Sequence, residues 1–180
     1  MKKLCMILPL ALILCFMVGC QDKEAMAELK AMKAQAEVEE QNKELARKMF
    51  EEWSKGEFEA FKELLASDYA YYFPSRSTKP MSREETIEMG KMLRKAFPDI
   101  NWSIEELFAV GDRVIFSFIL RGTHKGEFEG IPATGNKIES SGILITRIEN
   151  GKVVEQKEES DNLDLMMQLG MELKPKETEK

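Results

Sequence analysis

The sequence contains few of the residues on which covalent and metal-based sites depend. It has three cysteines and one histidine in 180 residues. Cys5 and Cys15 lie in an apolar N-terminal segment, so we expect no disulfide in the folded domain. Zinc sites usually take three or four nitrogen or sulfur ligands, and His124 alone does not supply them. A thiolate nucleophile and a zinc site are therefore excluded, whereas an all-oxygen metal site remains open.

Positive charge is also in deficit, and neither glycine nor proline is in excess. Lys and Arg number 26 against 32 Asp and Glu, which gives a formal net charge of −6. Domains that hold nucleic acid through general electrostatics are basic, so we expect no nucleic-acid partner. With 43% hydrophobic residues the chain can bury a core, and its length is that of one domain with additional terminal segments.

The first twenty residues resemble the signal peptide of a bacterial lipoprotein. Lys2 and Lys3 precede an apolar run at 4–18, which is too short for a comfortable membrane span. Met17-Val18-Gly19-Cys20 then resembles a lipobox, although Met replaces the commoner Leu. We expect residues 1–19 to be removed and Cys20 to be acylated, which would attach an exported protein to a bacterial membrane. The alternatives are an ordinary signal peptide or an uncleaved anchor.

Composition divides the remaining chain into three parts. Residues 20–40 are rich in Ala, Glu, Lys and Met and contain neither Gly nor Pro, which predicts a helical tether. Met26, Leu29, Met32 and Ala36 form a thin apolar stripe, which either packs on the domain or a partner helix or belongs to a solvated stalk. We expect a compact domain at 41–171 and a polar tail at 172–180.

The hydrophobic period of the domain changes from helical to alternating, which predicts an α+β fold with helices first and a sheet later. Ser82 and Glu85 form a capping box, and Asn150-Gly151 is a type I′ hairpin signal. Helices are expected near 45–55, 58–65, 82–97 and 163–169, and strands near 69–73, 102–110, 114–121, 137–148 and 153–161.

Several motifs resemble the SnoaL-like polyketide cyclases, or ester cyclases, of the NTF2-like superfamily. The main one is the run Gly-Thr-His-Lys-Gly-Glu-Phe-Glu-Gly-Ile-Pro-Ala-Thr-Gly at 122–135. It is flanked by Gly-Asp-Arg-Val at 111–114, by Arg-Ile-Glu-Asn-Gly-Lys-Val-Val-Glu at 147–155, and by Asp161 with Leu-Met-Met-Gln-Leu-Gly at 165–170. The resemblance covers roughly residues 42–171.

This resemblance implies a cystatin-like, cone-shaped barrel in which a bent antiparallel sheet packs on about three helices. It further implies an apolar pocket inside the cone and frequent dimerisation through the sheet, so a homodimer is one expectation. Cyclases of the family close rings by intramolecular aldol condensation without metal or cofactor, and we accordingly expect none.

Asp161 matches the acid/base carboxylate of these cyclases. A carboxylate in an apolar cavity loses solvation, so its pKa rises and it can exchange protons near neutral pH. Asp161 also directly precedes Asn162 and Leu163, and an aspartate in that position can simply cap the final helix. The sequence does not decide between these two roles.

The chain departs from the family at two places. Members commonly carry His-Trp after the glutamate of the last strand, where Gln156-Lys157 follow Glu155 here. An early histidine is replaced by Tyr71 and Tyr72, which are either wall residues or hydrogen-bond donors to a carbonyl, because phenols are poor bases at neutral pH.

His124 is the other candidate acid/base group, because imidazole titrates near physiological pH. The alternative is a loop residue that fixes the bend after a strand. Trp102, Phe116 and Phe118 are candidate pocket residues, although aromatic residues at strand spacing more often belong to the core.

Three functions remain open. The favoured one is a lipid-anchored module that binds a small apolar or amphipathic molecule in the cone. The second is a cofactor-free enzyme of the ester cyclase or isomerase type, which works through Asp161. The third is a dimeric scaffold that presents the tether to a partner.

The membrane attachment can be tested by metabolic labelling with a palmitate analogue. We expect the label on the mature chain, because Cys20 would become its acylated N-terminus. Unlabelled protein would contradict the lipoprotein interpretation.

Overall fold

The computed structural model describes the backbone of residues 7–172 and 174, and the side chains of this range from residue 23 onward. The start of the expected signal peptide, the Cys20 side chain and most of the expected tail lie outside the described residues. The chain separates into two compact units, one ending at Val38 and the other beginning at Glu39.

Helix α1, Ile7–Lys55, runs through both units and is continuous across the predicted cleavage position. In the first unit Met26, Leu29 and Met32 are exposed. Within the described part of the chain, no helix combines the length and apolarity needed to cross a membrane.

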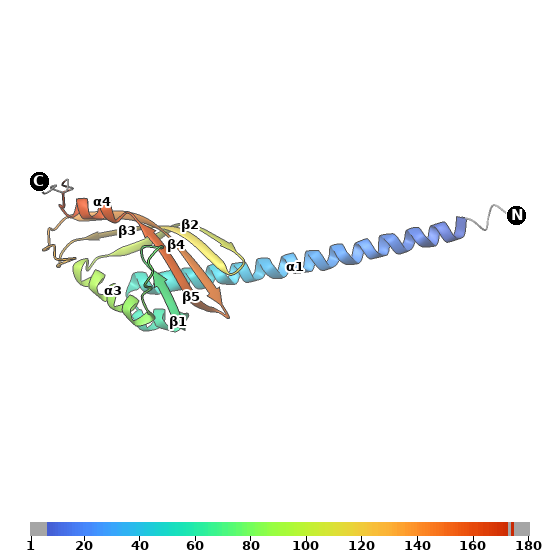
Figure 1. The fold of residues 1–180 in the computed structure, drawn as a ribbon, viewed down its shortest axis with the longest axis horizontal. Helices are drawn as coiled ribbons and strands as arrows, with labels where there is room; N and C mark the ends of the chain where they lie inside the picture. Colours follow the sequence, from blue (N-terminus) through green and yellow to red (C-terminus); the bar gives the residue numbers. More distant parts are fainter. Residues whose placement is uncertain (1–6, 173, 175–180) are drawn as a thin grey trace, which may run out of the picture. The chain divides into compact units, whose positions relative to one another are not determined.

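The second unit follows the predicted α+β order (Figure 1). After α1, whose end at Lys55 precedes Gly56 as expected, its elements are α2 (Phe58–Leu64), β1 (Leu65–Tyr72), α3 (Arg83–Ala96), β2 (Asn101–Val110), β3 (Arg113–Thr123), β4 (Lys137–Glu149), β5 (Lys152–Ser160) and α4 (Asn162–Gln168).

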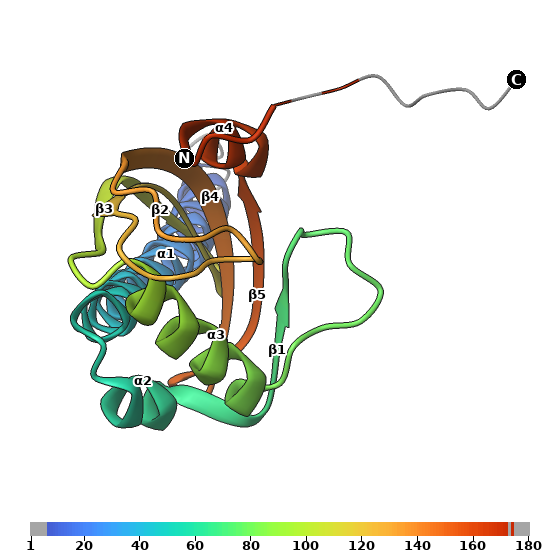
Figure 2. The ribbon, with the colours of Figure 1, turned by 90° about the vertical axis from the view of Figure 1, so that its left-hand side faces the viewer.

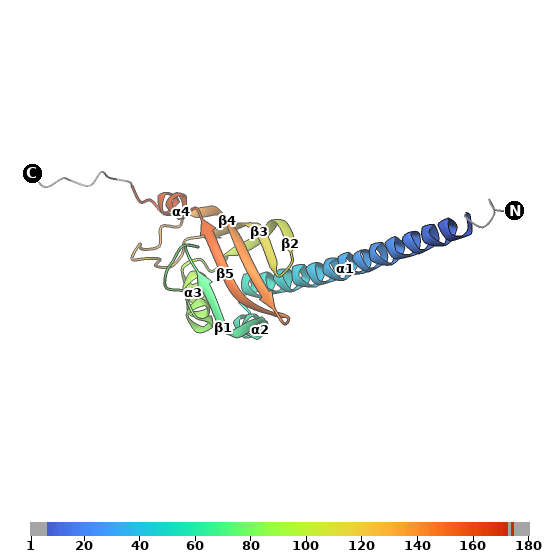
Figure 3. The same ribbon diagram turned by 45° about the vertical axis from the view of Figure 1, so that its right-hand side comes forward.

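The sheet has five strands in the order β1-β5-β4-β3-β2 (Figure 3). Its successive pairs from β2 to β5 are antiparallel, but β1 pairs with β5 in parallel. The sheet is therefore mixed, and the expectation of a wholly antiparallel sheet is wrong. The physical reason is that β1 and β5 are joined through α3 and three other strands, and a long crossover permits parallel pairing.

The expected barrel also needs correction. In the described residues β1 and β2 form the two edges of the sheet and do not pair with each other, so the sheet is bent but open. The described chain has four helices, at the four places that the hydrophobic pattern predicted.

The core lies between the inner face of the sheet and the helices α1 and α3 (Figure 2). Alternation along β3 turns Val114, Phe116 and Phe118 inward, and all three are buried. Phe50 of α1 packs edge-on against Phe116 with ring centroids 5.1 Å apart. This geometry is favourable for two aromatic rings, and it holds α1 on the sheet.

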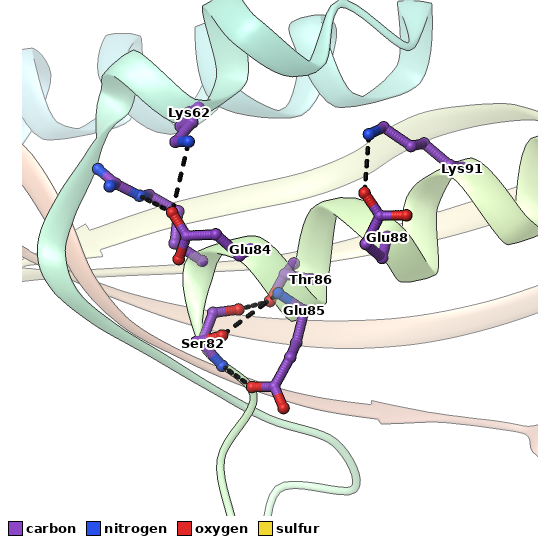
Figure 4. Close-up of polar contacts among 8 residues, drawn as sticks. Lys62, Ser82, Glu84, Glu85, Thr86, Glu88 and Lys91 are labelled. Atoms are coloured by element: carbon purple, nitrogen blue, oxygen red, sulfur yellow. Dashed lines mark hydrogen bonds and ion pairs between the residues drawn. The ribbon is translucent and has the colours of Figure 1, made fainter.

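Helix α3 begins at the predicted capping box. The Ser82 side chain accepts a hydrogen bond from the Glu85 backbone N–H, and the Glu85 carboxylate accepts one from the Ser82 N–H (Figure 4). Lys62 of α2 lies 3.4 Å from the Glu84 carboxylate. A Cβ on Gly90 would lie 2.6 Å from Phe58, so this glycine allows α3 to approach α2 closely.

The predicted hairpin is confirmed, and the neighbouring strands β3 and β4 are also joined by an ion pair. Asn150 and Gly151 both have positive φ, at 50° and 71°, as a type I′ turn requires. Arg121 on β3 lies 2.7 Å from Glu139 on β4. At the other end of the sheet, Leu165 and Leu169 bury α4 against Phe97 in a second apolar cluster.

Candidate functional site

A cavity of about 410 Å³ lies between α1, α3 and the inner face of the sheet. Most of its wall is apolar, with three methionines, Met49, Met89 and Met92, and with leucines from α3, β3, β4 and α4. Eight aromatic residues contribute to the lining: Phe50, Trp53, Phe61, Tyr71, Phe73, Trp102, Phe118 and Phe128. A volume and lining of this kind are typical of small-molecule sites.

Glu158 of β5 brings a carboxylate into this wall. Its Oε2 accepts a hydrogen bond of 2.7 Å from the Tyr71 hydroxyl, and its Oε1 accepts one from the Ser160 hydroxyl. Burial raises the pKa of Glu158, and the nearby Glu159 acts in the same direction. The hydrogen bonds from Ser160 and Tyr71 oppose this rise in pKa, because they stabilise the charged form.

Tyr71 reaches Glu158 because β1 lies directly beside β5. Burial raises the pKa of the Tyr71 phenol well above its usual range, and the neighbouring carboxylate raises it further. The phenol therefore acts as a hydrogen-bond donor at neutral pH. Its ring stacks parallel to that of Phe73, with centroids 6.1 Å apart.

Gln156, two residues before Glu158, is fully engaged in a buried network. Its amide oxygen accepts a hydrogen bond from the Tyr69 hydroxyl, and its Nε2 donates to Thr146 at 3.2 Å. The same nitrogen lies 3.4 Å from the sulfur of Met49. The family resemblance implies histidine at this position. The Gln156 side chain instead connects β1, β4 and α1, and an amide is neither an acid nor a base near neutral pH.

Three of the five predicted pocket residues line the cavity, namely Tyr71, Trp102 and Phe118. Phe116 is fully buried in the core and is not among the lining residues. Tyr72 is also outside the lining, and Lys157 lies over its ring at 5.4 Å. Strand alternation explains the difference between Tyr71 and Tyr72, since successive side chains point to opposite faces.

Asp161 lies at the N-cap of α4. Its Oδ1 accepts a hydrogen bond of 2.9 Å from the Asp164 backbone N–H. The side chain is exposed and does not line the cavity. This geometry is that of a helix cap, one of the two roles that the sequence left open.

His124 is completely buried, with 0% of its surface exposed, and it does not line the cavity either. Its Nδ1 lies 3.0 Å from the Thr134 hydroxyl, and its ring packs on Phe97. Backbone hydrogen bonds join its N–H to Asn136 and its carbonyl to Gly135. These contacts fit a residue that closes the base of the loop.

Glu158 was missed as a site residue, although the sequence held a signal for it. Gln156, Glu158 and Ser160 alternate along β5 and all line the cavity, as period-2 geometry requires. What the sequence did not show is which face of this polar strand is the inner one, because Lys157 and Glu159 are equally polar.

The outer face of the sheet exposes Phe108, Val110 and Ile143. An apolar face of this kind is compatible with the expected homodimer, which stays a prediction.

The bent sheet, the covering helices and the largely apolar cavity between them together define an NTF2-like α+β domain. The model of the family described as SnoaL-like polyketide cyclase matches residues 43–169. The chain therefore belongs to the SnoaL-like polyketide cyclase family, as its motifs predicted.

Solved structures agree with this assignment. AclR from Streptomyces galilaeus, a candidate hydroxylase, is 25% identical with a TM-score of 0.67, and the match covers 73% of this chain and 97% of that one. IdmH from Streptomyces antibioticus, a candidate polyketide cyclase, is 27% identical with a TM-score of 0.64, and the match covers 72% and 99%. A candidate polyketide cyclase from Acidithiobacillus ferrooxidans is 29% identical with a TM-score of 0.63, covering 72% and 94%. No curated protein matches the chain.

The half-buried, desolvated carboxylate of Glu158 predicts that its contribution to stability falls as the pH rises. The folded-state pKa of Glu158 is raised above its ordinary value of 4.5. The contribution of Glu158 to the stability of the fold is therefore most favourable below pH 4.5, and it is lost as the pH rises through the folded-state pKa. Glu158→Gln removes this titration and keeps an amide in place of the carboxyl group. We expect the free energy of unfolding of Glu158→Gln, relative to wild type, to increase between pH 4.5 and 8.

Urea unfolding across this pH range measures the difference. Asp161→Asn is the control, since it removes a carboxylate outside the cavity. A difference between Glu158→Gln and wild type that stays constant with pH would contradict the raised pKa.

Proposed function

We propose that this domain binds a small, largely apolar molecule inside the cavity and that Glu158 is the polar anchor of the bound molecule. The observation that carries the proposal is the aromatic wall of the 410 Å³ cavity with a single carboxylate at its sheet side. Burial of apolar ligand surface supplies affinity, and a few placed polar groups fix orientation. Tyr71 and Ser160 hold the Glu158 carboxylate in a defined position.

The proposal includes a location at a membrane. Acylation of Cys20 in the lipobox-like segment would tether the domain outside the cytoplasm, and the helix that follows Cys20 would serve as the spacer. A binding domain at this place would collect an apolar molecule close to a bilayer.

Native and denaturing mass spectrometry of the full chain, purified gently from its own host, tests for a bound molecule. We expect a stoichiometric small molecule that is released on denaturation. Met89→Trp should reduce its occupancy about tenfold or more, since the larger indole fills part of the cavity from α3.

Glu88→Trp is the matched control, because Glu88 neighbours Met89 on α3, is exposed and does not line the cavity. Both variants should melt within a few degrees of wild type. Equal occupancy in Met89→Trp and Glu88→Trp would show that the molecule binds elsewhere.

A second candidate function is acid/base catalysis by Glu158. A carboxylate whose pKa is raised by an apolar cavity can remove a proton from carbon next to a carbonyl and later return it. The electron pair of the C–H bond passes into the enolate, and the proton resides on Glu158. Membership of the SnoaL-like family and the similarity to IdmH support this candidate.

Hydrogen–deuterium exchange at the α-carbon of a β-keto ester tests this chemistry without the natural substrate. We expect the wild-type chain to accelerate exchange and Glu158→Gln to reduce the acceleration about 100-fold or more. Asp161→Asn should retain it, because Asp161 lies outside the cavity. Loss of exchange in Asp161→Asn at unchanged melting temperature would return the catalytic assignment to Asp161.

A further inference from the structure

The charges around the cavity are strongly one-sided. Glu158 lies within the wall, and the exposed Glu127 and Glu129 contribute from the loop after β3. Lys95 at the end of α3 is the one basic residue among the lining residues, and it is exposed. An anionic ligand would therefore meet three carboxylates and one ammonium group, so the field of the site disfavours it.

The chain provides no cationic partner to Glu158 among the described residues. Both carboxylate oxygens accept hydrogen bonds from neutral hydroxyl groups, those of Tyr71 and Ser160. Lys157, the adjacent basic residue, turns to the other face and lies 3.3 Å from Glu155. Arg94 donates to the carbonyl oxygens of Trp53 and Ser54 and is not part of the lining.

A half-buried, largely desolvated carboxylate without a counter-ion is unfavourable, since neutral hydrogen bonds restore only part of the lost hydration. A cation brought by the ligand would supply the missing charge. The aromatic wall suits the same group, because aromatic faces are negative and attract ammonium ions. Tyr71 links the two features: its hydroxyl binds Glu158, and its ring, stacked on that of Phe73, forms part of the wall.

We propose that the molecule bound in the cavity is an amphipathic amine, with its apolar body among the aromatic residues and its protonated nitrogen at Glu158. This inference rests on the proposed binding function and adds the chemical class of the ligand. Methionines in the wall, Met49, Met89 and Met92, suit an apolar body of variable shape, because methionine side chains adapt to irregular surfaces.

Three probes that differ only in their head group test the proposal. They are 2-(1-naphthyl)ethylamine, 2-(1-naphthyl)ethanol and the anion 3-(1-naphthyl)propanoate, titrated calorimetrically at pH 7 into the full chain in lipid nanodiscs, with empty nanodiscs as the blank. We expect the amine to bind more tightly than the alcohol, and the carboxylate to bind most weakly.

Glu158→Gln should lower the affinity for the amine about tenfold or more, since one partner of a desolvated charge pair is lost. The affinity for the alcohol should stay nearly unchanged. Glu155→Gln is the matched control: it removes a carboxylate from the same strand that pairs with Lys157 and does not line the cavity. It should leave the affinity of all three probes unchanged.

The outcomes separate this inference from the binding function itself. If the alcohol binds as well as the amine and Glu158→Gln affects neither, the amine inference is overturned while the binding function stands. If Met89→Trp also changes no affinity, or if no probe binds, the cavity is not the binding site of such molecules and both fail. Should Glu158→Gln lose the fold, the ranking of the three probes on the wild-type chain decides the inference.

Discussion

The parallel pairing of β1 with β5 is the contact on which the site depends. It joins the first strand of the domain to the last and places Tyr71 opposite Gln156 in register. Only through this pairing can the Tyr71 hydroxyl reach Glu158 and the Tyr69 hydroxyl reach Gln156, across 87 residues of sequence in each case. Both bonds hold polar groups at the inner face, where unpaired ones would be costly.

The desolvation of Glu158 by the cavity wall bears on both proposed functions, ligand binding and acid/base catalysis. An apolar wall that favours a hydrophobic ligand also desolvates Glu158 and raises its pKa. Both proposed roles of Glu158 draw on this property: the carboxylate would act as a base toward an acidic C–H bond of the ligand, and as a counter-ion to an ammonium group. Among the described residues, the hydrogen bonds to this carboxylate come from the neutral hydroxyl groups of Tyr71 and Ser160, which leave its charge uncompensated.

Asp161 and Glu158 show that sequence motifs alone did not identify the carboxylate of the cavity. Asp161 matched a family motif, but its geometry is that of a cap for α4. Glu158 belonged to no quoted motif, and it is the carboxylate that β5 places in the inner wall of the cavity. His124 similarly closes a loop by bonding to Thr134. The chemistry of a side chain is visible in the sequence, whereas its solvation depends on which neighbours cover it.

The sequence by itself determined the α+β order, the capping box at Ser82, the turn at Asn150-Gly151 and the family, because these rest on local periodicity, local hydrogen bonds and short motifs. Tertiary structure alone decided that β1 joins β5 in parallel and that the sheet stays open. It also decided which face of β5 points inward. Those features arise from contacts between residues far apart in the chain, and a strand as polar as 155–160 carries no local signal for the side that will be buried.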